Sequence, residues 1–189
     1  MRRSGTRRAT DLRPECIPLG FLSEKPAHGY ELFREFKSTL GGLWHISESQ
    51  MYATLQRLQK RGLVSVARVR KGAAAESRVL SLTGEGRTEF EKWLRTSTVC
   101  VPRLLRLEYI TRVFFAYRRN DGTLDIVMQE QERELQREIQ RLESLAEAED
   151  GEAAGLDVAR MMRTFRLDQV RAAFAWIRKN NSGIGGVST

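Results

Sequence analysis

Cysteines, histidines and long apolar runs are scarce in this chain of 189 residues, and each shortage excludes a class of protein. Its two cysteines, Cys16 and Cys100, are too few for a secreted fold held by disulfides. No run of about 18 apolar residues occurs, so no membrane-spanning helix is expected. The arginine-rich N-terminus lacks the apolar segment of a signal peptide, and the chain is therefore expected to be cytoplasmic.

Metal ligands and catalytic groups are equally scarce. The two histidines, His28 and His45, and the two cysteines do not fall at the spacings of a metal site, so no metal or cofactor is expected. No nucleophile lies beside a base and no glycine-rich phosphate-binding loop occurs, so the chain is not expected to be an enzyme. Cys16 and Cys100 are interpreted as small buried apolar residues, and a redox-sensing thiol is the alternative left open.

The basic side chains are unevenly distributed. Residues 1–95 contain 18 Lys and Arg against 10 Asp and Glu, whereas residues 96–189 contain 14 of each, so the whole net charge of +8 lies in the first half. This asymmetry favours a polyanionic partner for one domain, and a solvated basic face is the alternative.

A capped helix is predicted at residues 47–60. Ser47 and Gln50 have the spacing of a capping box, and Gly62 is typical of a helix end. Apolar residues at i, i+4 and i+7 form one buried face, namely Met51, Leu55 and Leu58. The opposite face has no carboxylate after Glu48 and consists of polar, small or cationic residues: Ser49, Gln50, Ala53, Gln56, Arg57 and Lys60.

A hairpin of two strands is predicted after this helix, at residues 63–69 and 77–82, with a basic tip between them. Two helices precede it, at residues 16–22 and 27–40, and the second carries Tyr30, Phe33, Phe36 and Leu40 on one side. Another helix follows, which Thr83 caps. This order is that of a winged helix-turn-helix, in which one helix enters the DNA major groove and the hairpin contacts phosphates.

Two groups of DNA-binding residues follow from this prediction. Gln56 and Arg57 suit bidentate contacts to adenine and guanine. Phosphate contacts are predicted for Ser49, Gln50, Tyr52 and Lys60 on the helix, and for Arg68, Arg70, Lys71 and Arg78 on the wing. Tyr52 has the alternative of packing against the second helix, and a solvated surface is the alternative for all of them.

The C-terminal half is predicted to be helical, at residues 104–118, 124–149 and 156–179. Met128, Leu135, Ile139 and Leu142 form a narrow seam, interrupted by Gln131, which favours contact with a second copy of the chain. The expected fold is mainly α: a basic disordered arm (1–14), a winged-helix domain of three to four helices and a two-stranded wing (15–96), a helical dimerisation and effector domain (97–180) and a disordered tail (181–189).

Together these segments resemble the PadR-like transcriptional regulators. The resemblance rests on residues 26–32, 41–44, 47–52, 62–64, 78–83 and 86–87, and on the pattern of 107–115. It implies a homodimeric repressor that binds a palindromic operator in double-stranded DNA and is relieved by a small molecule or a stress signal, with the C-terminal helices forming the dimer. The chain departs from the family pattern at Ser49, Ala53, Val79 and Leu80. A MarR-like regulator or an adaptor that binds protein and not DNA are the alternatives.

Three aromatic residues are candidates to line an effector cavity: Trp93, Phe165 and Trp176. Indole rings favour a planar, apolar effector, because they offer stacking and little hydrogen bonding. A role in the core is the alternative, since such spacing is common in buried helix faces.

Overall fold

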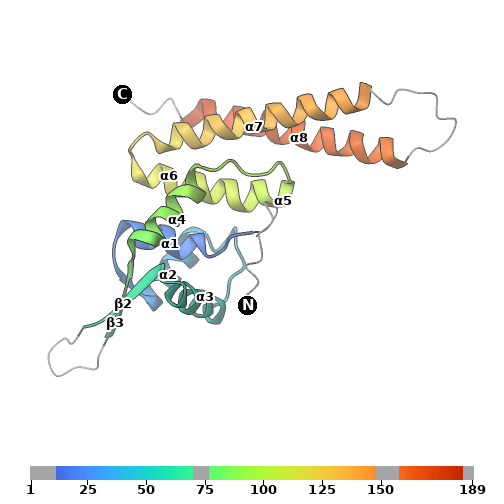
Figure 1. Ribbon diagram of the computed structural model, residues 1–189. Helices are drawn as coiled ribbons and strands as arrows, with labels where there is room; N and C mark the ends of the chain where they lie inside the picture. The colour runs from blue at the N-terminus through green and yellow to red at the C-terminus, as the bar shows by residue number, and fades with distance from the viewer. Residues whose placement is uncertain (1–11, 70–76, 148–157, 185–189) are drawn as a thin grey trace. The chain divides into compact units, whose positions relative to one another are not determined.

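A computed structural model describes residues 12–69, 77–147 and 158–184 of the chain (Figure 1). These residues form two compact units, one spanning Leu12–Arg95 and the other beginning at Thr96. Within the described ranges, no helix is both long and apolar enough to cross a membrane.

The first unit has the element order of a winged helix-turn-helix. Strands β2 and β3 lie side by side as a hairpin (Figure 1), and together with β1 they form an antiparallel sheet of order β1-β3-β2. The elements are α1 (Cys16–Glu24), β1 (Ala27–His28), α2 (Gly29–Thr39), α3 (Glu48–Lys60), β2 (Val64–Val69), β3 (Ser77–Leu82) and α4 (Gly84–Arg95).

The third strand is an addition to the predicted two-stranded wing. Ala27 pairs with Leu80 and His28 with Val79 in the antiparallel ladder. The ring of His28 reinforces this pairing, because its Nδ1 lies 3.0 Å from the carbonyl oxygen of Arg78. A strand of two residues is too short to show an alternation of apolar and polar positions, so it could not be predicted from the sequence.

The core of the first unit is formed by aromatic and aliphatic side chains from all four helices. Phe21, Phe36 and Phe90 are at most 2% exposed, and the ring centroid of Phe90 lies 5.7 Å from that of Trp93. Trp93 itself is 2% exposed, and burying such a side chain contributes on the order of 2 kcal/mol. Trp93 is therefore a core residue of this unit, which was the alternative to a role in lining an effector cavity.

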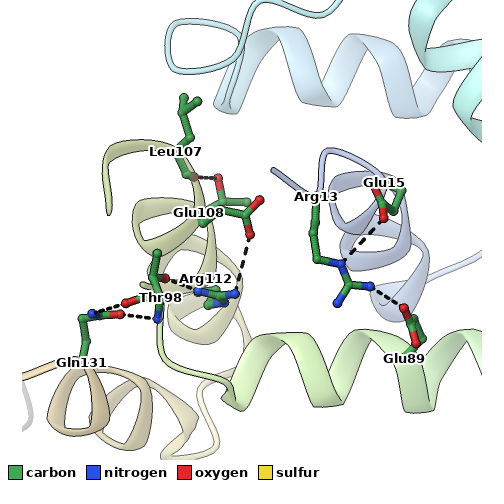
Figure 2. A network of polar contacts seen from close by, with 9 residues as sticks. Arg13, Glu15, Glu89, Thr98, Leu107, Glu108, Arg112 and Gln131 are labelled. Carbon is green, nitrogen blue, oxygen red and sulfur yellow. Dashed lines mark hydrogen bonds and ion pairs between the residues drawn. The ribbon is translucent and has the colours of Figure 1, made fainter. Parts of the chain in front are cut away.

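The start of the described chain is held more firmly than the expected disordered arm. Arg13 donates a hydrogen bond to Glu89 of α4, and its Nε lies 3.7 Å from a carboxylate oxygen of Glu15 (Figure 2). Arg61 also approaches Glu89, at 3.7 Å. Residues 12–14 thus belong to the first unit, while the rest of the expected arm, residues 1–11, lies outside the described residues.

The regular elements of the second unit are all helices in its described part. Helices α7 and α8 run side by side as an antiparallel pair (Figure 1), joined by ion pairs from Arg166 to Glu138 (2.8 Å) and from Arg171 to Glu143 (2.6 Å). The elements are α5 (Pro102–Leu104), the π-helix η1 (Leu105–Tyr109), α6 (Ile110–Arg119), α7 (Thr123–Glu147) and α8 (Val158–Ile184).

The last helix extends further than predicted. The tail was expected to begin at residue 181, but α8 continues to Ile184. Asn181 is half-buried and donates a hydrogen bond of 3.1 Å to Glu132 on α7. The glycine- and serine-rich composition from residue 181 onward suggested a disordered tail. The hydrogen bond from Asn181 to Glu132 instead stabilises the end of α8 against α7.

The predicted dimer seam requires a correction. Met128, Leu135 and Leu142 are buried within the single chain, and Ile139 is half-buried. Helix α7 packs against α6 and α8 of the same chain, and this packing covers the seam. A periodic apolar stripe predicts a helical partner but does not tell whether the partner belongs to the same chain.

Gln131, which interrupts the seam, belongs to a buried polar cluster (Figure 2). Its Oε1 accepts a hydrogen bond of 2.7 Å from the Thr98 backbone N–H, and its Nε2 donates one of 2.9 Å to the Thr98 carbonyl. Arg112 donates to the Thr98 hydroxyl and lies 3.6 Å from a carboxylate oxygen of Glu108. These contacts hold the segment between α4 and α5 against α6 and α7, because each buried polar group finds a partner there.

Candidate nucleic-acid interface

Helix α3 begins at the residue that the capping box predicts. The Ser47 hydroxyl accepts a hydrogen bond of 3.2 Å from the Gln50 backbone N–H, and the Gln50 side-chain oxygen accepts one of 2.8 Å from the Ser47 N–H. The helix ends before Gly62, whose φ of 75° lies in the left-handed region that glycine enters without strain. Since the side-chain oxygen of Gln50 is engaged in the cap, its amide N–H groups are what it can offer to a phosphate.

The two faces of α3 divide as the sequence predicts. Met51, Leu55 and Leu58 are at most 4% exposed and lie in the core of the first unit. Every helix residue predicted to contact DNA is exposed: Ser49, Gln50, Tyr52, Gln56, Arg57 and Lys60. The buried stripe therefore turns an unbroken polar surface, without a carboxylate after Glu48, toward solvent.

Arg57 is both exposed and oriented. Its Nη2 donates a hydrogen bond of 2.9 Å to the hydroxyl of Thr54, one turn earlier on the same helix. Thr54 is itself buried, so this contact restricts the guanidinium without removing it from solvent. The remaining N–H donors of Arg57 can make the two parallel hydrogen bonds that a guanine edge accepts.

Tyr52 lies against the start of α2. A Cβ placed on Gly29 would come within 2.7 Å of Tyr52 Cε1, so the ring occupies the space that a side chain at position 29 would need. The Tyr52 side chain is nevertheless 39% exposed. Its ring thus packs against the second helix, and contact with DNA remains a prediction for the exposed part.

Two arginines face one another across the wing. Arg68 on β2 and Arg78 on β3 are directly paired in the antiparallel register, and both are exposed. Like charges in opposite positions destabilise a sheet, and a bound anion relieves that repulsion. Arg70 and Lys71, the other predicted wing residues, lie outside the described residues.

Tyr30 is an exposed aromatic residue that sequence reasoning missed as a surface group. The residue was assigned to the apolar side of its helix, but its side chain is 55% exposed and stacks on His28, with ring centroids 5.7 Å apart. Its place in the first turn of α2 was the available signal, because side chains there lean toward the helix start. The carboxylate of Glu31 accepts a hydrogen bond of 2.8 Å from the His28 backbone N–H, which lowers the pKa of Glu31.

Neither cysteine has the surroundings of a reactive thiol. Cys16 and Cys100 are both buried, and neither is joined in a disulfide within the described residues. Burial raises the pKa of Cys100 to about 12, and the carboxylates of Glu134 and Glu138 raise it further. At neutral pH the Cys100 thiol is therefore protonated, whereas redox sensing requires a thiolate. Among the described residues, no group of three His, Cys, Asp or Glu side chains is arranged to hold a metal ion.

The candidate effector residues belong to different units. Trp93 lies in the core of the first unit, whereas Phe165 and Trp176 lie on α8 and are 65% and 51% exposed. An exposed phenylalanine and tryptophan on one helix are available to a ligand or to a second protein chain.

Comparison with known proteins identifies the first unit. Residues 19–92 match the sequence profile of the Transcriptional regulator PadR-like family, and this match covers nearly the whole winged helix. That family consists of transcriptional regulators and not of enzymes.

Two curated relatives and one solved structure show the extent of the similarity. The chain is 28% identical over 97 residues to the negative transcriptional regulator PadR of Bacillus subtilis, and 29% identical over 73 residues to the probable transcriptional regulator Rv1176c of Mycobacterium tuberculosis. These matches cover 51% and 39% of this chain, and they span 53% and 39% of the two relatives. A crystal structure of Bacillus subtilis PadR in complex with operator DNA aligns with 89% of this chain and 97% of its own, at 20% identity and a TM-score of 0.45.

Proposed function

Because residues 19–92 are a PadR-like transcriptional regulator domain, we propose that this chain is a homodimeric repressor that binds a palindromic operator in double-stranded DNA. In this proposal the winged helix at residues 15–96 binds DNA, and residues 97–180 provide dimerisation and the response to a small molecule. The regulators to which the chain is similar include one whose name describes it as negative, which supports repression over activation.

The paired arginines of the wing are the observation that most supports DNA binding. Arg68 and Arg78 are paired in the antiparallel register and exposed on the wing, and two neighbouring guanidinium groups there suit the phosphates of a polyanion. An adaptor that binds protein through α3 is disfavoured, because the exposed face of α3 carries Gln56 and Arg57 and no carboxylate after Glu48.

Arg57→Ala is expected to weaken binding to the preferred sequence by about 1–3 kcal/mol and to relax the preference at one base position. The physical reason is the loss of a bidentate donor that Thr54 holds in place. The preferred sequence is first obtained by selecting bound fragments from random DNA, and affinities are then measured by fluorescence anisotropy on the selected and on random duplexes.

Arg78→Ala is the matched control on the wing. It is expected to lower the affinity for specific and random duplexes by the same factor. The slope of log affinity against log salt concentration is expected to fall by about the amount that one phosphate contact contributes. If Arg57→Ala also lowered the affinity for both duplexes equally, Arg57 would not recognise a base.

The dimer surface that we propose lies on α8. Val158, Met161, Met162 and Phe165 are each at least 58% exposed and fall on one side of this helix, which a helical partner would cover. A parallel strip of the same helix carries Thr164, Asp168 and Arg171, which are suited to solvent. The second copy would thus replace the predicted α7 seam with the apolar side of α8.

A double substitution of this side, Met162→Glu with Phe165→Glu, is expected to convert a dimer into a monomer, because buried carboxylates are costly without partners. Light scattering at micromolar concentration measures the mass. Thr164→Glu, on the polar strip, is expected to remain dimeric. A monomeric unsubstituted chain, or a dimer that survives the double substitution, would contradict this assignment.

A further inference from the structure

Residues 96–101 connect α4 to α5 without a helix or strand of their own, and one of them is held from three sides. The Gln131 side chain on α7 accepts a hydrogen bond of 2.7 Å from the Thr98 backbone N–H and donates one of 2.9 Å to the Thr98 carbonyl (Figure 2). Arg112 on α6 donates a third hydrogen bond, to the Thr98 hydroxyl. Because hydrogen bonds are directional, three of them from two helices fix both the position and the rotation of Thr98.

The pairing with the Thr98 backbone depends on the chemistry of the glutamine side chain. A primary amide carries a donor and an acceptor side by side, so it can satisfy the N–H and the C=O of one residue at once. Two residues on neighbouring antiparallel strands exchange hydrogen bonds in the same way. An ionised glutamate lacks the donor, and methionine, of similar volume, offers only a weak acceptor.

An apolar residue would suit position 131 better if stability of the helix pair were its only role. Gln131 interrupts the apolar seam between Met128 and Leu135 and is 1% exposed. Burying an amide costs free energy unless its groups are hydrogen-bonded, whereas a leucine would fill the seam without that cost. Buried polar groups of this kind are best attested as devices that fix one structural register.

The three hydrogen bonds lie close to the boundary between the two units. The first unit ends at Arg95, and Thr98 is 3% exposed, so residues 96–97 alone lie between them. Two residues span at most about 7 Å. Without these bonds the next buried residue is Cys100, and residues 96–99 would span up to about 14 Å. Holding Thr98 thus halves the length of chain that separates the two units.

We propose that Gln131 is a positioning residue: by clamping Thr98 to α7, it restricts the movement of the DNA-binding unit relative to the second unit. The clamp is defined as the contacts of Gln131 and Arg112 with Thr98. In a homodimer, two such clamps hold the two DNA-binding units at one spacing, so that the protein selects operators by the distance between their half-sites. This consequence rests on the proposed function, whereas the clamp itself does not.

The DNA test measures the affinity of the full chain for three duplexes: the selected palindrome, the same palindrome with two base pairs inserted at its centre, and a single half-site. Two inserted base pairs rotate one half-site by about 70° relative to the other. The unsubstituted chain is expected to lose about tenfold in affinity on this insertion, because a matched geometry gives the highest effective concentration. Gln131→Met is expected to lose less than about threefold, and to keep its affinity for the single half-site.

Gln136→Met is the matched control, because Gln136 is exposed on the same helix. This variant is expected to show the tenfold loss of the unsubstituted chain. Light scattering and circular dichroism establish that each variant is a folded dimer. A folded, dimeric Gln131→Met variant that still loses about tenfold on the insertion would overturn the proposal.

A second variant leaves the buried cluster intact. Two glycines inserted between Arg95 and Thr96 double the number of residues between the first unit and the clamp, and glycine-rich segments are flexible. The insertion is expected to reduce the spacing preference as Gln131→Met does. If Gln131→Met did not fold as a dimer, this variant would decide, since an unchanged spacing preference would overturn the proposal.

Tryptic cleavage after Arg95 tests the clamp without DNA. Arg95 is exposed, and cleavage there requires the residues that follow to leave their contacts transiently. Gln131→Met is expected to be cut at this bond about tenfold faster than the unsubstituted chain and Gln136→Met, as mass spectrometry of the fragments measures. Equal rates would overturn the clamp. A chain that binds the palindrome no more tightly than the half-site would overturn the proposed function instead, and the cleavage rates would still decide the clamp.

Discussion

Gly86→Ala is expected to destabilise the winged-helix unit by about 3 kcal/mol, the upper end of the usual cost of overpacking. A Cβ at this position of α4 would come within 2.1 Å of the Leu63 carbonyl oxygen and 2.8 Å of Leu82 Cδ1. The carbonyl cannot turn away freely, because it accepts a hydrogen bond of 3.2 Å from the Thr83 backbone N–H. Helix α4 and the wing would have to move apart. Denaturant unfolding, followed by the fluorescence of the buried Trp93, measures the loss of stability.

Gly84→Ala, two residues earlier on the same helix, is the control for this prediction. A Cβ there meets nothing within 4 Å, and the substitution reduces the conformational entropy of the unfolded chain. It is expected to leave the stability unchanged or to increase it by about 0.5 kcal/mol. Equal stabilities of the two variants would show that the contact between Gly86 and Leu63 relaxes without cost.

Arg112→Met is expected to destabilise the second unit by about 3–5 kcal/mol, because it removes the cation that lies 3.6 Å from the buried carboxylate of Glu108. Both residues are at most 6% exposed, and the same substitution removes the hydrogen bond to the Thr98 hydroxyl (Figure 2). Denaturant unfolding followed by circular dichroism measures the loss of stability, since the regular elements described in this unit are all helices.

Two further variants test whether the buried charge is the cause. Arg133→Met breaks an exposed pair with Glu130 on α7 and is expected to cost about 0.5 kcal/mol or less. Adding Glu108→Gln to Arg112→Met also removes the negative charge of the buried carboxylate. The double variant is therefore expected to recover part of the lost stability. A double variant less stable than Arg112→Met would assign the loss to packing.

Local signals in the sequence predicted the first unit well, because they act over a few residues. Ser47 and Gln50 form the predicted capping box, and Gly62 has the predicted positive φ. The apolar stripe of α3 correctly separated its buried from its exposed residues. Each of these features depends on a backbone conformation that neighbouring residues impose, so no knowledge of distant contacts was needed.

Features that depend on distant partners were less predictable. In the sequence, Gln131 is a polar residue that interrupts an apolar seam. Its partner, the Thr98 backbone, lies 33 residues earlier and meets the Gln131 amide only in the folded chain. The same seam suggested a second chain, whereas α6 and α8 of the same chain pack against α7 and cover it. Trp93 and Trp176 were grouped by residue type, but one is in a core and the other on a surface. Periodicity identifies the side of a helix and not the element that covers it.

The π-helix makes the length of the segment 102–119 as important as its composition. Five residues, Leu105–Tyr109, occupy a turn that the α-helix completes with about 3.6. Deletion of one residue from this turn would let a regular α-helix form and would leave the helix downstream in nearly the same phase, because the π-turn holds about one residue more than an α-helical turn. Deletion of Thr111 in the regular helix that follows would instead rotate Arg112 by about 100° away from Thr98. A single deletion is therefore absorbed inside the π-turn, whereas elsewhere in the segment it changes the phase of every residue that follows.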